Sequence, residues 1–174
     1  DTYLVDQNAC SSPHLVVWLG KGDKKNRLKF WEYLNEVVKK KYDISHFASM
    51  DKITKLYRDI IELKNLNNFV NFESNLHVIN LKSLNQNNHE MRGKWGFFYE
   101  FETDKLEKIN KFINKKYQTL TYFGLKKIFI SKFVKKNKLQ GIDRIVPIGQ
   151  SLNMNFFWDG YDINKILTRV IDIQ

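Results

Sequence analysis

The feature that most constrains the fold is an alternation of short apolar runs with longer segments of helical periodicity. Leu15–Leu19 is a continuous apolar run that ends at Gly20, as expected for a buried strand. Between Lys24 and Lys41 the apolar residues recur every three or four positions, which predicts a helix with Asp23 as its N-cap. Alternating strands and helices predict an α/β fold with an open, mostly parallel sheet and helices on both of its faces.

Periodicity and turn-forming residues predict further helices and strands along the rest of the chain. A second helix is expected to begin near Ser45 and end near Leu63, and the Asn-rich stretch 65–71 is expected to break it. Further strands are predicted over 75–84, 95–101, 117–123 and 144–149, and further helices after Thr103, over 126–138 and from about 162, with a loop at 155–160. No repeat or linker divides the sequence, so residues 1–174 are expected to form a single domain.

The composition is that of a globular protein. Hydrophobic residues make up 43% and aromatic residues 14% of the chain, which excludes a disordered polypeptide. No apolar run approaches the roughly 20 residues that cross a bilayer, so no membrane span is expected. One cysteine excludes an internal disulfide and is typical of a reducing compartment, so a cytoplasmic location is expected. No histidine has metal-ligand spacing to a different ligand type, and no metal is expected.

The net charge of +10 comes mainly from lysines. They cluster at 39–41, 126–127 and 132–138. Such clusters can bind a polyanion, namely nucleic acid, coenzyme A phosphates or an acidic carrier protein. They can also be solvated helix faces. The second interpretation is favoured, and a nucleic-acid partner disfavoured, because few arginines accompany the lysines and arginine is the better bidentate ligand of phosphate.

Cys10 is the only cysteine of the chain and stands in a segment of small, turn-forming residues. Ala9, Ser11 and Ser12 flank it, and Pro13 keeps the segment from continuing as a helix. An accessible thiol on a tight loop directly before a buried strand suits a nucleophile. The alternative is a small buried hydrophobic residue, the usual role of a lone cysteine.

The residues around Cys10 resemble the active-site segment of the aldehyde dehydrogenase superfamily. That segment has an apolar residue followed by Gly-Gln/Glu-x-Cys, whereas this chain has Gln7 at the glycine position and Asn8 at the Gln/Glu position. With Ser11-Ser12-Pro13 added, the segment looks more like the acyl-CoA reductase family, the reductase component of bacterial luminescence fatty-acid reductase. The resemblance implies that Cys10 is the catalytic nucleophile.

Two later segments are similar to the same family. Glu90-Met91-Arg92-Gly93 matches a Glu-x-x-Gly segment that precedes a strand, a helix and a strand containing Leu-Thr, here Leu120-Thr121. In that family the glutamate holds the nicotinamide ribose of the cofactor, so the resemblance implies a cofactor-binding role for Glu90. Lys94 replaces the proline that usually follows the glycine, and an ordinary loop glutamate is the alternative. The second segment, 144–160, is similar to the Arg-x-x-x-x-Gly and Trp-containing Asp-Gly block of the acyl-CoA reductases.

Within that last block, Phe156, Phe157 and Trp158 form a consecutive aromatic run. A fatty acyl chain requires an apolar pocket, so these three residues could wall an acyl channel and bind substrate. The alternative is that they belong to the core.

The resemblance implies an aldehyde dehydrogenase-like catalytic (thiol) domain of an NADP(H)-dependent acyl-CoA or acyl-carrier reductase. The Cys10 thiolate would take the acyl group from a thioester, and NADPH would reduce the acyl-enzyme to a fatty aldehyde, with the backbone N–H of Cys10 donating to the oxyanion. The first residue is Asp1 rather than Met, and no G-x-G-x-x-G loop occurs. The chain is therefore expected to be a fragment without its N-terminal cofactor-binding domain, and inactive by itself. An acyl-protein synthetase is a further expected partner.

Three other functions stay open at this point. An aldehyde dehydrogenase working in the oxidative direction would use the same residues. A basic nucleic-acid-binding module, or a module that docks an acidic partner, would use the lysines instead. A Cys–His protease is disfavoured, because Pro13 and the following strand should carry His14 away from the thiol.

Overall fold

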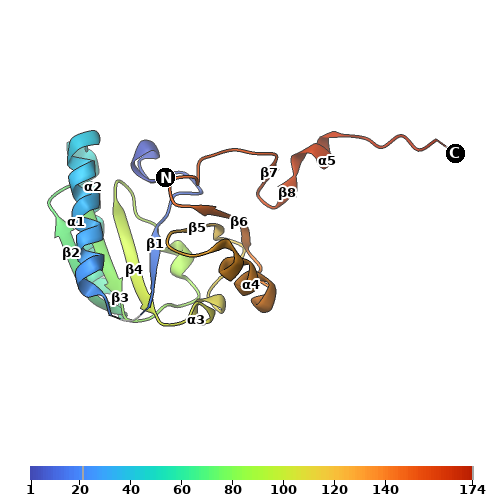
Figure 1. Cartoon of the computed structure of the whole chain (residues 1–174). Coiled ribbons are helices and arrows are strands. Elements are labelled where there is room, and N and C mark those ends of the chain that lie inside the picture. Colours follow the sequence, from blue (N-terminus) through green and yellow to red (C-terminus); the bar gives the residue numbers. More distant parts are fainter. Residues whose placement is uncertain (21, 174) are drawn as a thin grey trace. The chain divides into compact units, whose positions relative to one another are not determined.

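The computed structural model describes residues 1–20 and 22–173 and has the mixed α/β architecture that the sequence predicts (Figure 1). The chain divides into two compact units, 1–112 and 113–174, which are described separately below. Two compact units can belong to one domain, so the expectation of a single domain stays a prediction.

The first unit contains a four-stranded, mostly parallel sheet of order β1-β4-β3-β2. Its elements are η1 (Tyr3–Val5), β1 (Leu15–Leu19), α1 (Lys24–Lys41), α2 (His46–Glu62), β2 (Leu66–Phe72), β3 (Leu76–Leu81), η2 (Asn88–Glu90), β4 (Phe97–Thr103) and α3 (Glu107–Asn110). β4 is parallel to both β1 and β3, and β2 alone runs antiparallel, as the first arm of a hairpin with β3. The first and last strands of this unit are thus neighbours in space.

The two long helices cover opposite faces of this sheet. On one face Trp31 of α1 packs against Leu76, Val78 and Phe98. Phe97 and Tyr99, the neighbours of Phe98 along β4, point to the other face because side chains alternate along a strand. There the Tyr99 hydroxyl donates a hydrogen bond of 2.5 Å to Asp59 of α2. The expected covering of both sheet faces is confirmed for this unit.

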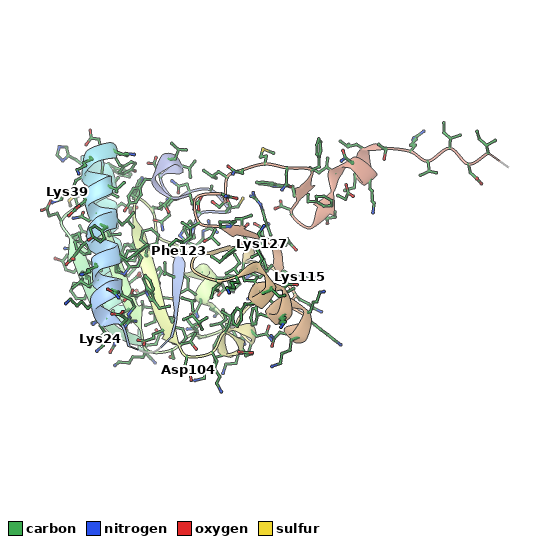
Figure 2. All side chains as sticks on the ribbon, viewed as in Figure 1. Lys24, Lys39, Asp104, Lys115, Phe123 and Lys127 are labelled. Atoms are coloured by element: carbon green, nitrogen blue, oxygen red, sulfur yellow. The ribbon has the colours of Figure 1, made fainter. Side chains whose placement is uncertain are left out.

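The ends of the two long helices follow from local chemistry. The Asp23 side chain accepts from the N–H of Asn26, which confirms the predicted N-cap. The Ser45 side chain accepts from the N–H of Ala48, so the second helix begins where it was expected to begin. Three lysines lie in the last turn of α1, where they complement the helix dipole. They are exposed, and Figure 2 shows Lys24 and Lys39 near the two ends of this helix. This placement agrees with solvated helix faces.

The Asn-rich stretch ends the second helix as predicted, since α2 stops at Glu62, but it also forms a strand that the sequence did not predict. This strand is β2, whose residues pair with β3 from Leu66 to Phe72. β2 lies at the edge of the sheet, and most of its side chains are exposed. A polar edge strand lacks the apolar periodicity that identifies buried strands, and asparagine is itself depleted in strands, so sequence patterning misses it.

The described residues of the second unit form two small sheets and two helices. Its elements are β5 (Gln118–Tyr122), α4 (Lys127–Asn137), β6 (Ile142–Pro147), β7 (Phe157–Trp158), β8 (Tyr161–Asp162) and α5 (Ile163–Leu167). β5 and β6 are parallel, and β7 and β8 form a short antiparallel pair. The Asp162 side chain caps α5 by accepting from the N–H of Lys165. None of the helices in the described part of the chain is long and apolar enough to cross a membrane.

Candidate functional site

Cys10 lies at an exposed turn that leads into β1. Its thiol is free and exposed. The turn is closed by a hydrogen bond of 3.0 Å from the N–H of Ser12 to the carbonyl of Ala9, whereas Ser11 and Ser12 on the far side of the turn are buried. The thiol is therefore presented to solvent on a turn whose next two residues are buried.

Gln7 fastens this turn to the start of β4, a role that sequence reasoning missed. Its side chain is 1% exposed and uses its full hydrogen-bonding capacity. The amide nitrogen donates to the carbonyls of Pro13 (2.8 Å) and Phe97 (2.9 Å). The amide oxygen accepts from the N–H groups of Gly96 and Phe97, both at 3.0 Å. One buried amide thus joins both ends of the Cys10 turn to β4.

The segment that carries Glu90 lies against the segment that carries Cys10. The Arg92 guanidinium approaches the carbonyl of Ala9 at 3.4 Å, and the N–H of Trp95 donates to the carbonyl of Asp6 at 3.1 Å. The reason is the sheet order. β1 and β4 are adjacent and parallel, so the loops that lead into them lie side by side at the same end of the sheet.

Gly93 makes this contact sterically feasible. A Cβ atom at Gly93 would lie 2.0 Å from the carbonyl oxygen of Phe97, far inside van der Waals contact. The N–H of Gly93 meanwhile donates to Nδ1 of His14 at 3.1 Å. The glycine of the Glu-x-x-Gly segment is therefore required by close packing against β4.

His14 is a structural part of this contact. Because its Nδ1 accepts the Gly93 N–H, the ring proton of the neutral form lies on Nε2. Burial, with the charges of Arg92 and Lys55 as lesser causes, lowers the pKa of His14 to about 4. A neutral ring whose only lone pair is already engaged has no capacity to act as a general base for Cys10.

A pocket with a volume of about 360 Å³ opens beside the same segment. Five basic residues line it, together with two acidic and two aromatic ones. They are Lys52, Lys55, Arg58, Arg92, Lys94, Asp51, Glu90, Trp95 and Phe97. The polar residues come from α2 and from the loop before β4, so the pocket is built by packing α2 on the sheet face that carries Phe97.

Lys52 is the most deeply placed of these cations. Its side chain is 2% exposed, and its ammonium donates to the carbonyl of Trp95 at 2.7 Å. Burial lowers the pKa of Lys52 to about 7. Nearby, the ammonium of Lys55 lies 3.0 Å from a carboxylate oxygen of Asp59 and 5.3 Å from the centre of the Phe97 ring.

Glu90 is exposed and lines the pocket. It ends the short helix η2, and its carboxylate lies 3.6 Å from Nε2 of His89. Two positions singled out from sequence, Cys10 and Glu90, therefore lie on two loops that are in contact, and Arg92 belongs to both the contact and the pocket.

The aromatic run lies in the second unit and is not part of its core. Phe156 and Phe157 are 64% and 67% exposed. Trp158 is half-buried, with the Arg144 guanidinium 4.8 Å from the centre of its ring. Arg144 also donates to the carbonyl of Ser151 at 2.6 Å, so this arginine organises the loop that displays the aromatic residues.

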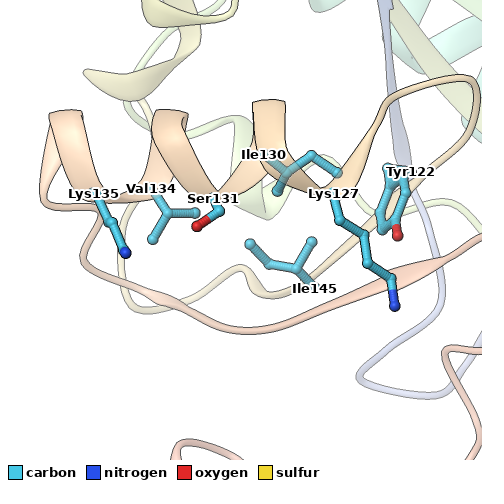
Figure 3. Close-up of a pocket in the computed structure, with 7 residues that line it drawn as sticks. All are labelled: Tyr122, Lys127, Ile130, Ser131, Val134, Lys135 and Ile145. Carbon is cyan, nitrogen blue, oxygen red and sulfur yellow. The ribbon is translucent and has the colours of Figure 1, made fainter.

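A second pocket, of about 250 Å³, lies within the second unit between α4 and its sheet. Figure 3 shows Ile130 and Val134 of α4 near Ile145 of β6, with Lys127 and Lys135 at the sides. Within the described residues, no group of three His, Cys, Asp or Glu side chains could hold a metal ion.

No protein-family model matches this sequence, and no curated protein matches it. Function therefore has to be inferred from the residues and their geometry.

Proposed function

We propose that this chain is the thiol domain of an acyl-CoA or acyl-carrier reductase, with Cys10 as the nucleophile. The observation that carries the proposal is the placement of Cys10. An exposed thiol stands on a turn whose two ends are fixed to β4 by the buried Gln7 amide. A nucleophile needs both access for the substrate and a fixed position, and this turn provides both.

The backbone at Gln7 gives independent support. Gln7 has a φ of 60°, in the left-handed region that glycine adopts most readily. It occupies the position at which the resembled active-site segment has glycine. The local backbone thus has the conformation that the family's residue favours, although the residue itself differs.

The chemistry would begin with attack of the Cys10 thiolate on the thioester carbonyl. The carbon–sulfur bond to the carrier breaks, the carrier leaves as its thiolate, and the acyl group remains on Cys10. The N–H of Cys10 would donate to the oxyanion of the tetrahedral state. NADPH, when bound, would supply the hydride that reduces the acyl group. Collapse of the resulting hemithioacetal then releases an aldehyde and regenerates the thiolate.

Glu90 remains the residue of this chain proposed to hold the cofactor ribose. Its carboxylate lines a pocket rich in basic groups, and this combination of a hydroxyl acceptor with cations fits a ligand that carries both hydroxyls and phosphates. Phe156, Phe157 and Trp158 remain proposed for the acyl chain, since two of them expose most of their apolar surface. A free thiol suits a reducing, cytoplasmic setting.

The direct test is acyl transfer to Cys10. The full-length protein is incubated with a series of isotopically labelled acyl-CoA thioesters and examined by mass spectrometry. We expect one acyl group on Cys10, removable by hydroxylamine, and none in Cys10→Ser. Asn8→Ala, an exposed neighbour, is the matched control and should be acylated like the wild type. Label on lysines only, or no label with any thioester, would refute the proposal.

The direction of turnover distinguishes the proposed reductase from an aldehyde dehydrogenase that works in the oxidative direction. The full-length protein is assayed with acyl-CoA plus NADPH, and separately with aldehyde plus NADP⁺. A reductase consumes NADPH only when thioester is present. Turnover with aldehyde and water alone would instead identify an aldehyde dehydrogenase.

A further inference from the structure

The pocket beside the Cys10 turn gathers the residues best suited to bind phosphate. Two of the five arginines of the whole chain, Arg58 and Arg92, line it together with three lysines. Guanidinium groups bind phosphate in a bidentate way that lysines do not reproduce. This concentration differs from the lysine clusters at 39–41, 126–127 and 132–138, which contain no arginine.

The cations in the pocket outnumber the carboxylates that could neutralise them. Asp51 and Glu90 are the acidic residues that line the pocket. A third carboxylate, that of Asp59, forms an ion pair with the lining residue Lys55. Lys52, buried at the pocket, donates its hydrogen bond to the main-chain carbonyl of Trp95. A concentration of positive charge around a pocket favours an anionic ligand.

We infer that this pocket, built by Lys52, Lys55, Arg58, Arg92 and Lys94, binds the phosphate groups of a ligand. A volume of about 360 Å³ can hold a diphosphate. Because Arg92 lines the pocket and also approaches the carbonyl of Ala9, a ligand held there would stand beside the Cys10 turn. This inference rests on the proposed function, because the phosphates are taken to belong to the substrate or cofactor of that reaction.

Two sources share this chemistry, a thioester carrier such as coenzyme A and a nicotinamide dinucleotide. Isothermal titration in 50 mM salt, on Cys10→Ser protein so that the thiol takes no part, compares three probes. Pyrophosphate tests the phosphate chemistry alone, and coenzyme A and NADPH test the two sources. We expect pyrophosphate to bind and the true source to bind more tightly and compete with it. Because the contacts are ionic, affinity should fall at 500 mM salt.

A pair of charge-reversed variants localises the binding. Arg58→Glu with Lys94→Glu should weaken pyrophosphate binding at least tenfold. The control, Lys25→Glu with Lys29→Glu, changes the net charge equally on exposed positions of α1 and should change affinity less than twofold. Circular dichroism and the melting temperature verify folding. If the doubly charge-reversed variant unfolds, the wild-type protein is acetylated on its lysines with and without pyrophosphate instead. We expect pyrophosphate to protect Lys94 from acetylation but not Lys29.

The outcomes separate this inference from the proposed function. No binding of any probe, or equal loss of affinity in the α1 control, would overturn the phosphate site. Equal acetylation of Lys94 with and without pyrophosphate would do the same. Acylation of Cys10 without phosphate binding refutes only the pocket assignment, whereas phosphate binding without acylation of Cys10 refutes only the thiol assignment.

Discussion

Gln7 and Phe97 exchange two hydrogen bonds, one in each direction, although they are 90 residues apart in the sequence. The side chain of Gln7 donates to the Phe97 carbonyl and accepts from the Phe97 N–H, as a neighbouring strand would. It therefore extends the pairing of β4 beyond the start of β1 and fixes the turn that carries Cys10.

Replacing Gln7 by Met keeps the length of the side chain but removes all of its hydrogen bonds. The N–H groups of Gly96 and Phe97 would then be buried without acceptors, at a cost of about 2–4 kcal/mol in unfolding free energy. Urea denaturation measures this loss. The rate of Cys10 alkylation by iodoacetamide should also change, because the turn is released. Asn8→Ala should alter neither, and a Gln7→Met protein as stable as the wild type would show that the amide does not fasten the turn.

Gly93→Ala should be strongly destabilising for a purely steric reason. The new methyl group would meet the carbonyl oxygen of Phe97 at 2.0 Å, so the loop would have to move away from β4. We expect a loss of about 2–3 kcal/mol or more. Gly20→Ala is the control, since nothing lies within 4 Å of its added Cβ and only its φ of 122° opposes the change. It should cost about 1 kcal/mol. Equal losses would contradict the close approach at Gly93.

The buried imidazole of His77 should make the protein sensitive to acid. Burial is the main cause that lowers the pKa of His77 to about 4, with the charge of Lys52 second. Between pH 6.5 and 4 the unfolded chain takes up a proton that the folded chain does not, so stability falls as the pH falls through this range. The contribution is about 3 kcal/mol. His77→Leu should lose correspondingly less stability between these two pH values, as followed by urea denaturation. Parallel losses in both proteins would show that another group is responsible.

Glu100 should contribute to stability through the indoles that it holds. One of its carboxylate oxygens accepts from Trp18 at 2.7 Å and from Trp31 at 2.9 Å, and the other accepts from Asn80 at 2.9 Å. Glu100→Leu leaves these donors without an acceptor and should cost about 2–4 kcal/mol. Glu100→Gln retains an oxygen for the indoles and should cost less. Denaturation followed by tryptophan fluorescence reports both the stability and the indole environment. A leucine variant no less stable than the glutamine variant would contradict this role.

Several elements were predictable because their signal is local. The helix Lys24–Lys41 and its cap Asp23 follow from apolar spacing and a side chain that accepts the first free N–H, and both are confirmed. The strand Leu15–Leu19 follows from an uninterrupted apolar run and is confirmed as a strand. The prediction that it is buried is wrong, because β1 lies at the edge of its sheet and its residues are half-buried or exposed. Neither prediction needs knowledge of any distant residue. The edge strand β2 was missed because its stability comes from pairing with β3 rather than from its own polar sequence.

Local patterns in the sequence suffice to predict most of the helices and strands, the N-cap Asp23 and the choice of Cys10 as the candidate nucleophile. The neighbouring positions of β1 and β4 became known only from the three-dimensional fold. Because these strands are neighbours, the loops that carry Cys10 and Glu90 are in contact. The fold also places the Gln7 amide oxygen where it accepts from the N–H of Gly96, and it brings Arg58 and Arg92 to the same pocket. The physical reason is that helix and strand periodicity is encoded within a few residues, whereas strand order and pocket lining depend on packing between residues far apart in the chain.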